Sequence, residues 1–206
     1  MEQLFLTSNA SKVLSDIVKH LPLKPSEYNF AFINTATETR EEHTCVINDK
    51  NKMVELGFNV DEFSITGMNL AEIKEKMKDK NGVFLCGGNP LHLLDQMIKT
   101  GFDKVLLDRI EKGLVCIGSS AGSMIFGNDL DLANVLDAKS TAPDLKSNGF
   151  KILDLVIFPH WGNDDMKDLY YNGFDALYNR NSKLVFLRDN QYVYFNGDNY
   201  IINQIS

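Results

Sequence analysis

The sequence predicts an α/β fold of three layers, in which helices cover both faces of a mostly parallel central sheet and the C-terminus adds an antiparallel extension. Over most of the chain, short apolar runs rich in Val, Ile, Phe and Leu alternate with longer amphipathic segments. This alternation is typical of parallel strands joined by crossover helices, because such strands are buried on both faces. The last part of the chain instead has short strand-like pieces separated by turn residues, which favours an antiparallel hairpin or meander.

The apolar runs define the strands that we expect. They lie at residues 3–7, 29–34, 59–65, 82–85, 114–118 and 153–158. The strand-like pieces of the C-terminal extension are residues 183–188, 191–195 and 200–202. The exposed edge of this extension offers a surface on which two copies of the chain could pair, so a homodimer is one expectation.

Helices are expected between the strands, where apolar residues recur every three or four positions. They are residues 11–20, 38–56, 70–78 and 90–100. The last of these begins with Pro90 and ends before Gly101, as helices often do. Residues 127–149 have no regular pattern and are expected to form a long loop near the chemistry. Because the chain has no internal repeat or Pro-rich linker, residues 1–206 are expected to form a single domain.

The composition is that of an ordinary globular protein, with 44% hydrophobic and 24% charged residues. The formal net charge of -7 argues against a nucleic-acid-binding protein, because affinity for phosphates comes mostly from clustered Lys and Arg. No apolar run approaches the length of a membrane span, and the N-terminus lacks the pattern of a secretory signal. We therefore expect a cytoplasmic protein that binds neither nucleic acid nor membranes.

The cysteines and histidines show none of the spacings that metal sites use. Cys45, Cys86 and Cys116 form no CxxC pair and are expected to be reduced core residues. The histidines form no HExxH motif and have no cysteine at ligand spacing; they are His20, His43, His92 and His160. The sequence therefore predicts no metal and no cofactor.

The strongest chemical signal is a GxSxG motif centred on Ser120, where the apolar run at residues 114–118 passes directly into a helical pattern. Such a tight strand-to-helix turn holds the central serine above the edge of the sheet. The amide N–H of Ala121 follows the serine at the start of the helix and is one expected donor to a developing oxyanion. Ser120 is therefore the predicted nucleophile.

A second strand, residues 82–85, ends in the glycine pair Gly87-Gly88 just before a helix. Glycines let a ligand approach backbone amides closely, and ligands of open parallel sheets bind at the carboxyl ends of strands. The pair is expected to face Ser120, with Gly88 as the second oxyanion donor. The alternative is that the pair forms only a turn.

His160 follows the strand expected at residues 153–158, which we expect to lie in the same sheet as the strand before Ser120. A serine hydroxyl needs a base within hydrogen-bond reach, and imidazole is the usual one. His160 is therefore the predicted base, with His92 as its nearest rival. The carboxylate that completes a triad is open among several aspartates between Ser120 and His160, with Asp144 preferred and Asp137 next. The remaining candidates are Asp129, Asp131 and Asp154.

The order and spacing of four segments are similar to those of peptidase family S51, which contains dipeptidase E and cyanophycinase, and the resemblance covers most of the chain. The segments are Leu85-Cys86-Gly87-Gly88-Asn89-Pro90, Gly118-Ser119-Ser120-Ala121-Gly122-Ser123, Asn148-Gly149-Phe150 with Leu153-Asp154-Leu155, and Pro159-His160. The resemblance implies a class I glutamine amidotransferase-like fold and cofactor-free hydrolysis of small peptides with an acidic N-terminal residue. It gives Ser120 as nucleophile, His160 as base, and the amides of Gly88 and Ala121 as oxyanion donors.

The sequence departs from the family pattern at two places. Thr141 stands where the family's dipeptidases carry an acidic residue, so the triad acid does not carry over. The segment after His160 contains Asp164 and Asp165 where basic residues would hold an aspartyl substrate, and like charges would repel it. A preference for aspartyl peptides therefore does not carry over from the family, and whether the substrate has an N-terminal Asp stays open.

Two other functions use the same features. An esterase or thioesterase of the α/β-hydrolase class also has GxSxG, but its histidine usually lies much farther along the chain than His160 lies from Ser120. A non-catalytic α/β module could bind a small ligand in the same crevice, because a fold alone does not establish chemistry. Labelling of Ser120 by a fluorophosphonate would distinguish a catalytic serine hydrolase from the non-catalytic binding module.

Overall fold

The computed structural model describes residues 3–130, 149–178, 182–197 and 199–206 of the chain. Its largest element is a seven-stranded sheet in the order β3-β2-β4-β5-β1-β8-β9. The first five strands of this order are parallel to one another. They are β3 (Asn59–Phe63), β2 (Asn29–Ile33), β4 (Gly82–Leu85), β5 (Val115–Ser119) and β1 (Gln3–Thr7).

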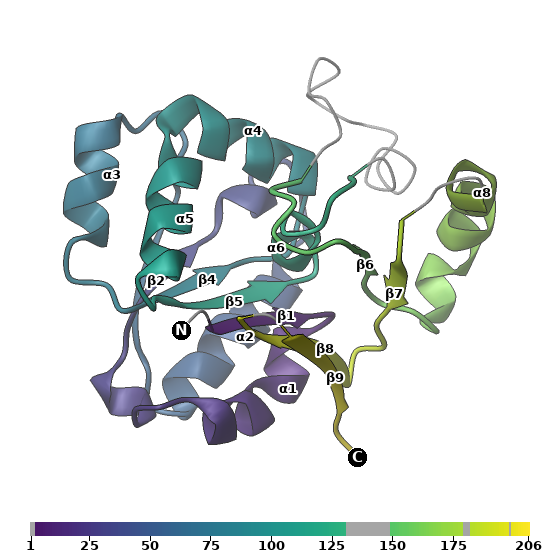
Figure 1. The fold of residues 1–206 in the computed structure, drawn as a ribbon, viewed down its shortest axis with the longest axis horizontal. Coiled ribbons are helices and arrows are strands. Elements are labelled where there is room, and N and C mark those ends of the chain that lie inside the picture. Colours follow the sequence, from purple (N-terminus) through teal and green to yellow (C-terminus); the bar gives the residue numbers. More distant parts are fainter. Residues whose placement is uncertain (1–2, 131–148, 179–181, 198) are drawn as a thin grey trace.

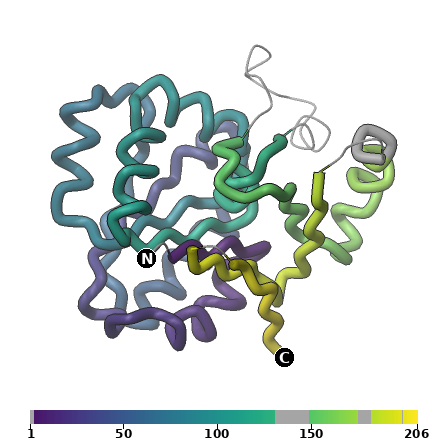
Figure 2. Tube along the Cα trace, in the orientation of Figure 1, coloured from purple at the N-terminus to yellow at the C-terminus, as the bar shows by residue number. Residues whose placement is uncertain are grey.

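The C-terminus extends the sheet with two antiparallel strands, as predicted. The strand β8 (Gln191–Asn196) pairs with β1, and β9 (Asn199–Gln204) pairs with β8 and forms the outer edge. Figure 2 shows this arrangement, in which strands from opposite ends of the chain lie side by side.

Helices cover both faces of the sheet and complete the predicted three layers (Figure 1). One face carries α1 (Ala10–Ile17), which continues as a 3-10 turn (Val18–His20), and α2 (Thr44–Glu55). The other face carries α3 (Leu70–Met77), α4 (Pro90–Thr100), α5 (Phe102–Glu111) and the single turn α6 (Ala121–Met124). Each helix turns an apolar stripe to the sheet; in α1 this stripe is Val13, Leu14 and Ile17, all fully buried.

The prediction for residues 153–158 is wrong in its sheet assignment. The strand there, β6 (Val156–Phe158), pairs in parallel with β7 (Leu184–Phe186) in a separate two-stranded sheet. In the large sheet, the position beside β1 is occupied by β8. The piece at residues 183–188 consequently belongs to this small sheet and not to the antiparallel extension.

The small sheet packs into the same apolar cluster as one face of the large sheet. Its buried members include Ile157, Phe158 and Val185. The helix α8 (Lys167–Tyr178), preceded by a 3-10 turn (Asp164–Met166), lies beside it, and Tyr170 of α8 contacts Phe158 with ring centroids 6.0 Å apart.

The helices differ from the prediction at three main points. The helix expected at residues 38–56 begins only at Thr44, because a 3-10 turn (Thr35–Thr37) and a bend come first, and Glu38 is held outside it by Ser64, Thr66 and His92. The helices α5 and α8 were not predicted. Most of the loop expected at residues 127–149 lies outside the described residues.

Two of the three cysteines follow the prediction. Cys86 and Cys116 are buried in the core, whereas Cys45 at the start of α2 is exposed, which corrects its assignment to the core. In the described part of the chain, no helix has both the length and the apolar character needed to cross a membrane.

Candidate active site

Ser120 occupies the tight turn between β5 and α6 that the GxSxG motif predicts. Its backbone has φ 50° and ψ -110°, a conformation that a residue with a side chain seldom adopts. The Ser120 N–H donates to the carbonyl of Thr7 at 3.0 Å, which fixes the turn to the end of β1. The turn can close this tightly because Gly122 has no side chain. An added Cβ at this position would lie 2.2 Å from the Leu85 carbonyl oxygen. The Ser120 side chain is thereby held at the carboxyl end of the sheet.

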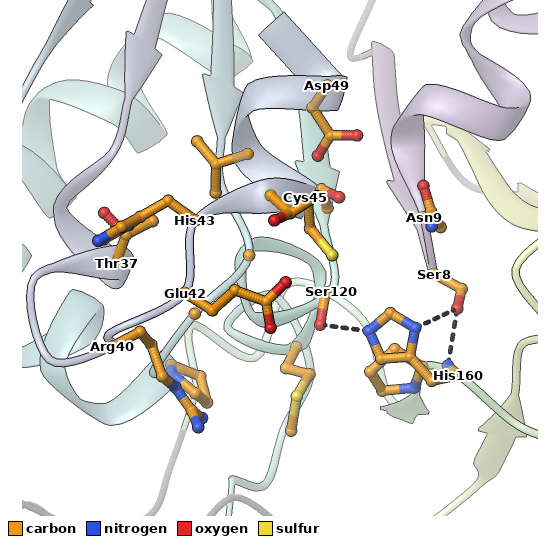
Figure 3. Close-up of a pocket in the computed structure, with 18 of the residues that line it drawn as sticks. Ser8, Asn9, Thr37, Arg40, Glu42, His43, Cys45, Asp49, Ser120 and His160 are labelled. Carbon is orange, nitrogen blue, oxygen red and sulfur yellow. Dashed lines mark hydrogen bonds between the residues drawn. The ribbon is translucent and has the colours of Figure 1, made fainter. Parts of the chain in front are cut away.

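His160 reaches Ser120 from the small sheet, in the loop that follows β6. Its Nε2 lies 2.9 Å from Ser120 Oγ. Figure 3 marks this hydrogen bond with a dashed line. His160 also has a positive φ of 61°, so both partners of this hydrogen bond have strained backbones. The neighbouring residues hold the loop: the Tyr170 hydroxyl donates to the Pro159 carbonyl, and the Trp161 N–H donates to the Leu187 carbonyl at 3.0 Å.

The carboxylate on the far side of His160 is Asp189, in the turn between β7 and β8. Its Oδ1 lies 2.8 Å from His160 Nδ1. Sequence reasoning missed this residue because it searched only between Ser120 and His160. His160 was predicted because a polar side chain at the end of a strand-like run often lies in a site. Asp189 follows the strand-like run at residues 183–188, so the same pattern indicates it.

Among the described residues, none of the acids predicted by the sequence lies beside His160. Asp144, Asp137, Asp131 and Thr141 lie outside the described residues. Asp154 is exposed and pairs with Lys183 at 3.0 Å, and Asp129 does not line the pocket described below.

The environment of Asp189 keeps it ionised. Burial alone would raise the pKa of Asp189, but hydrogen bonds from His160, Asn163 and Ser8 outweigh burial and hold this pKa well below its usual range. An ionised carboxylate only accepts hydrogen bonds, so the proton between Asp189 and His160 belongs to Nδ1. The Nε2 atom of a neutral imidazole is then left to accept the Ser120 hydroxyl proton.

The end of β1 connects all three groups. Besides the bond from Ser120 to Thr7, the buried hydroxyl of Ser8 accepts the His160 backbone N–H at 2.7 Å and donates to Asp189 Oδ1 at 2.9 Å. Two consecutive residues therefore join the nucleophile on the large sheet to the histidine of the small sheet and to Asp189.

The glycine pair faces Ser120, as predicted. A Cβ at Gly87 would lie 3.4 Å from Ser120 Cβ, and Gly88 has φ 139° with the Ala36 carbonyl directly against it. Only glycine fits at Gly88, because an added Cβ would come within 2.1 Å of that oxygen. Within the described residues, neither the Gly88 amide nor the Ala121 amide has a hydrogen-bond acceptor. Since α6 is only four residues long, its dipole contributes little at Ala121.

A cavity of about 380 Å³ opens in front of Ser120. Its described lining includes Gly87 and Gly88, His160, and the bend and start of α2. The bend brings Arg40 and Glu42 to this wall, and Figure 3 shows the Glu42 carboxylate directed towards Ser120. The exposed pair Asp164 and Asp165 is absent from the described lining, so the acidic groups of the pocket come from the α2 side.

The other histidines are placed differently. His43 lines the pocket from the residue before α2, His92 bonds Glu38 at 2.8 Å, and His20 lies against Tyr194. Among residues 3–130, 149–178, 182–197 and 199–206, no group of three or more His, Cys, Asp or Glu side chains is arranged to hold a metal ion.

Asp49 is a buried carboxylate in the pocket wall. It is only 2% exposed and accepts the Ser11 N–H at 2.7 Å. Burial raises the pKa of Asp49 to about 6, and hydrogen bonds from Ser119 and the Ser11 backbone oppose this rise only in part. Folding therefore favours the protonated carboxyl group, and this contribution to stability is lost as pH rises through about 6.

We expect Asp49→Asn to be more stable than the wild type at pH 7.5, by up to about 3 kcal/mol, because one pKa unit corresponds to about 1.4 kcal/mol. The amide keeps an acceptor for the Ser11 N–H. The gain should disappear near pH 4, where Asp49 is protonated in the wild type. Urea unfolding of both proteins from pH 4 to 7.5 measures the difference, with exposed Asp108→Asn as the control. A difference independent of pH would contradict the assignment.

Comparison with known proteins places this site in a family. The model of the family described as "Peptidase family S51" matches residues 4–203. An uncharacterised peptidase of Listeria monocytogenes is 28% identical over 204 residues, covering 94% of this chain and 98% of its own. An uncharacterised peptidase of Pasteurella multocida is 29% identical over 164 residues, covering 79% of each chain. A peptidase E of Shewanella baltica is 29% identical over 106 residues, which are 50% of this chain and 42% of that protein.

Solved structures agree with the fold. A crystal structure from Listeria monocytogenes EGD-e, whose name assigns it provisionally to peptidase E, superposes with a TM-score of 0.91 at 25% identity and full coverage of both chains. A peptidase from an acI-B1 Actinobacterium superposes with a TM-score of 0.73 at 18% identity, covering all of this chain and 88% of that one, and shows the fold alone. With the family model matching nearly its whole length, the chain belongs to peptidase family S51.

Proposed function

We propose that this chain is a serine peptidase that hydrolyses small peptides from one end, with Ser120 as nucleophile and His160 as general base. The observation that carries the proposal is the continuous hydrogen-bonded chain from Ser120 Oγ through His160 to Asp189, with distances of 2.9 and 2.8 Å. This is the arrangement that serine hydrolases of unrelated folds use.

The hydrogen bonds define the proton movements of the proposed reaction. Ser120 Oγ attacks the scissile carbonyl while its proton passes to His160 Nε2, and Asp189 stabilises the imidazolium through Nδ1–H. The imidazolium then gives its proton to the leaving amine, which leaves an acyl group on Ser120. Water, deprotonated by the same Nε2, attacks the ester; the bond to Ser120 Oγ breaks, the acid is released, and the imidazolium returns its proton to Oγ. Apart from the substrate and water, every group in these reaction steps belongs to the protein, so the proposed mechanism uses no cofactor.

The amides of Gly88 and Ala121 are the proposed donors to the oxyanion. Their positions beside Ser120 and their lack of an acceptor in the described residues support this role. An amide that is already oriented stabilises developing negative charge without reorganisation.

The pocket favours a short substrate with a free amino group. Its volume of about 380 Å³ lies at the small end of the range for ligand sites. Glu42 is placed to bind an α-ammonium group beside the scissile bond, and Arg40 adds a positive group farther along the same wall. The acidic wall does not favour an aspartyl side chain at the N-terminus. A cytoplasmic location remains a prediction.

Ser120→Ala should abolish turnover and labelling by a fluorophosphonate, because the attacking oxygen is lost. Labelling is read by mass spectrometry of the intact protein, and hydrolysis by amine release from a dipeptide panel. Ser123→Ala, which removes a neighbouring hydroxyl that bonds the Thr7 carbonyl, should still be labelled at Ser120. Retention of wild-type hydrolysis by Ser120→Ala would overturn the nucleophile assignment.

Ser8→Ala should lower kcat by roughly 10- to 100-fold with little change in KM, because His160 loses a backbone anchor and its geometry loosens. Asp189 would also lose a donor, so it would orient the imidazole less firmly. Ser8→Thr keeps the hydroxyl and should recover much of the rate. Ser64→Ala removes a hydroxyl outside the pocket and should leave kcat and KM unchanged. An unchanged kcat in Ser8→Ala would contradict this positioning role.

N-acetylation of the best dipeptide substrate should lower kcat/KM by roughly 10- to 100-fold, the value of a charge-assisted hydrogen bond. Glu42→Gln should impair the free dipeptide similarly but leave the acetylated one unaffected. The panel includes acidic, neutral and basic N-terminal residues, and we expect neutral or basic ones to be preferred. Equal effects of Glu42→Gln on both substrate forms would show that Glu42 does not bind the amine, and a strong preference for aspartyl peptides would refute the expected selectivity.

A further inference from the structure

The two edges of the large sheet are built differently. The edge strand β3 carries Asp61 and Glu62, which pair with Lys80 at 3.1 Å and Lys50 at 2.6 Å. Charged side chains on an edge strand are a common device that prevents pairing with another chain. This edge is therefore protected.

The opposite edge has no such protection. The strand β9 has the sequence NYIINQ, without a charge or a proline. Tyr200, Ile201 and Ile202 are 43%, 60% and 46% exposed, and no strand of the described residues pairs with its outer side. A six-residue, uncharged edge strand with exposed Tyr200, Ile201 and Ile202 near its centre presents backbone N–H and C=O groups to a further strand.

We propose that the chain forms a two-fold symmetric homodimer in which β9 pairs antiparallel with β9 of a second copy. The two seven-stranded sheets would then join into one continuous sheet. A two-fold axis makes a strand meet its own sequence in the opposite direction, so the strand must complement itself.

The pleat of the sheet restricts how the two strands can align. Residues opposite each other in an antiparallel pair point to the same face. Tyr200 and Ile202 lie opposite Phe195 and Val193 and share their face, whereas Ile201 lies opposite Tyr194 on the other face. A residue can therefore meet only residues of its own face in the second copy, which excludes pairing Ile201 with Ile202.

The alignment centred on Ile201 satisfies this restriction and places side chains of similar chemistry opposite each other. It places Ile201 against Ile201 of the second copy, Tyr200 against Ile202, and Asn199 against Asn203. Aromatic and β-branched residues that face each other across strands stabilise a sheet, and the amides of the two Asn can bond each other. Self-complementarity of this kind favours a second copy over an unrelated partner.

Association should depend on concentration, because one strand pair is a small interface and each copy carries a formal charge of -7. Sedimentation velocity from about 1 to about 500 µM brackets a weak interface of this size. We expect the mass to rise from the 23.3 kDa of one chain towards twice that value. A mass of one chain throughout would overturn the proposal.

Ile201→Lys should abolish this rise, because it places two ammonium groups opposite each other at the centre of the pair. The matched control is Val54→Lys on α2, where the native side chain is similarly exposed at 56%. Equal association of Ile201→Lys and the wild type would also overturn the proposal.

Cysteine cross-linking tests the alignment directly in a Cys45→Ser background, because Cys86 and Cys116 are buried. Ile201→Cys should form an intermolecular disulfide, since directly opposite Cβ atoms lie about 5 Å apart. Ile202→Cys should not, since its copies would be diagonal neighbours about 7–8 Å apart. Failure of Ile201→Cys to cross-link, or faster cross-linking of Ile202→Cys, would refute the alignment.

Discussion

The carboxyl end of β1 is the point at which the two sheets of this protein are tied together. Thr7 accepts the Ser120 N–H and the Ser123 hydroxyl through its carbonyl, at 3.0 and 2.8 Å. Ser8, the next residue, bonds the His160 backbone and Asp189. Because Ser120 belongs to the large sheet and His160 to the small one, their distance is set by these contacts and not by a shared strand ladder. The hydrogen bond between Ser120 and His160 depends on this anchor.

Strain at the site is offset by the same contacts. Ser120 and His160 both have positive φ, and such a conformation costs about 1–3 kcal/mol for a residue with a side chain. It persists where surrounding bonds determine the backbone: Thr7 binds the Ser120 amide, Ser8 binds the His160 amide, and Leu187 binds the next amide. The GxSxG motif predicts the tight turn at Ser120 from a few neighbouring residues, but no such motif surrounds His160.

What the sequence could predict was local. Strand patterns, the GxSxG turn and the glycine pair are encoded in a few neighbouring residues, and the structure agrees with them within one or two residues at most ends. The acid partner of His160 was missed because Asp189 is 29 residues farther along the chain and reaches it only through pairing of β6 with β7. The early part of the predicted helix at 38–56 failed because contacts of Glu38 with distant side chains replace helical bonds.

The insertion of β8 beside β1 explains several of these outcomes at once. The strand β8 occupies the edge of β1, and β6 pairs with β7 in a separate sheet. The turn from β7 into β8 must then cross from the small sheet to the large one next to the end of β1, and this crossing carries Asp189 to His160 and Ser8. The same insertion moves the edge of the sheet outward to β9, a strand with no charged residue. One antiparallel pairing therefore determines both where the acid of the site lies and which edge of the molecule is open.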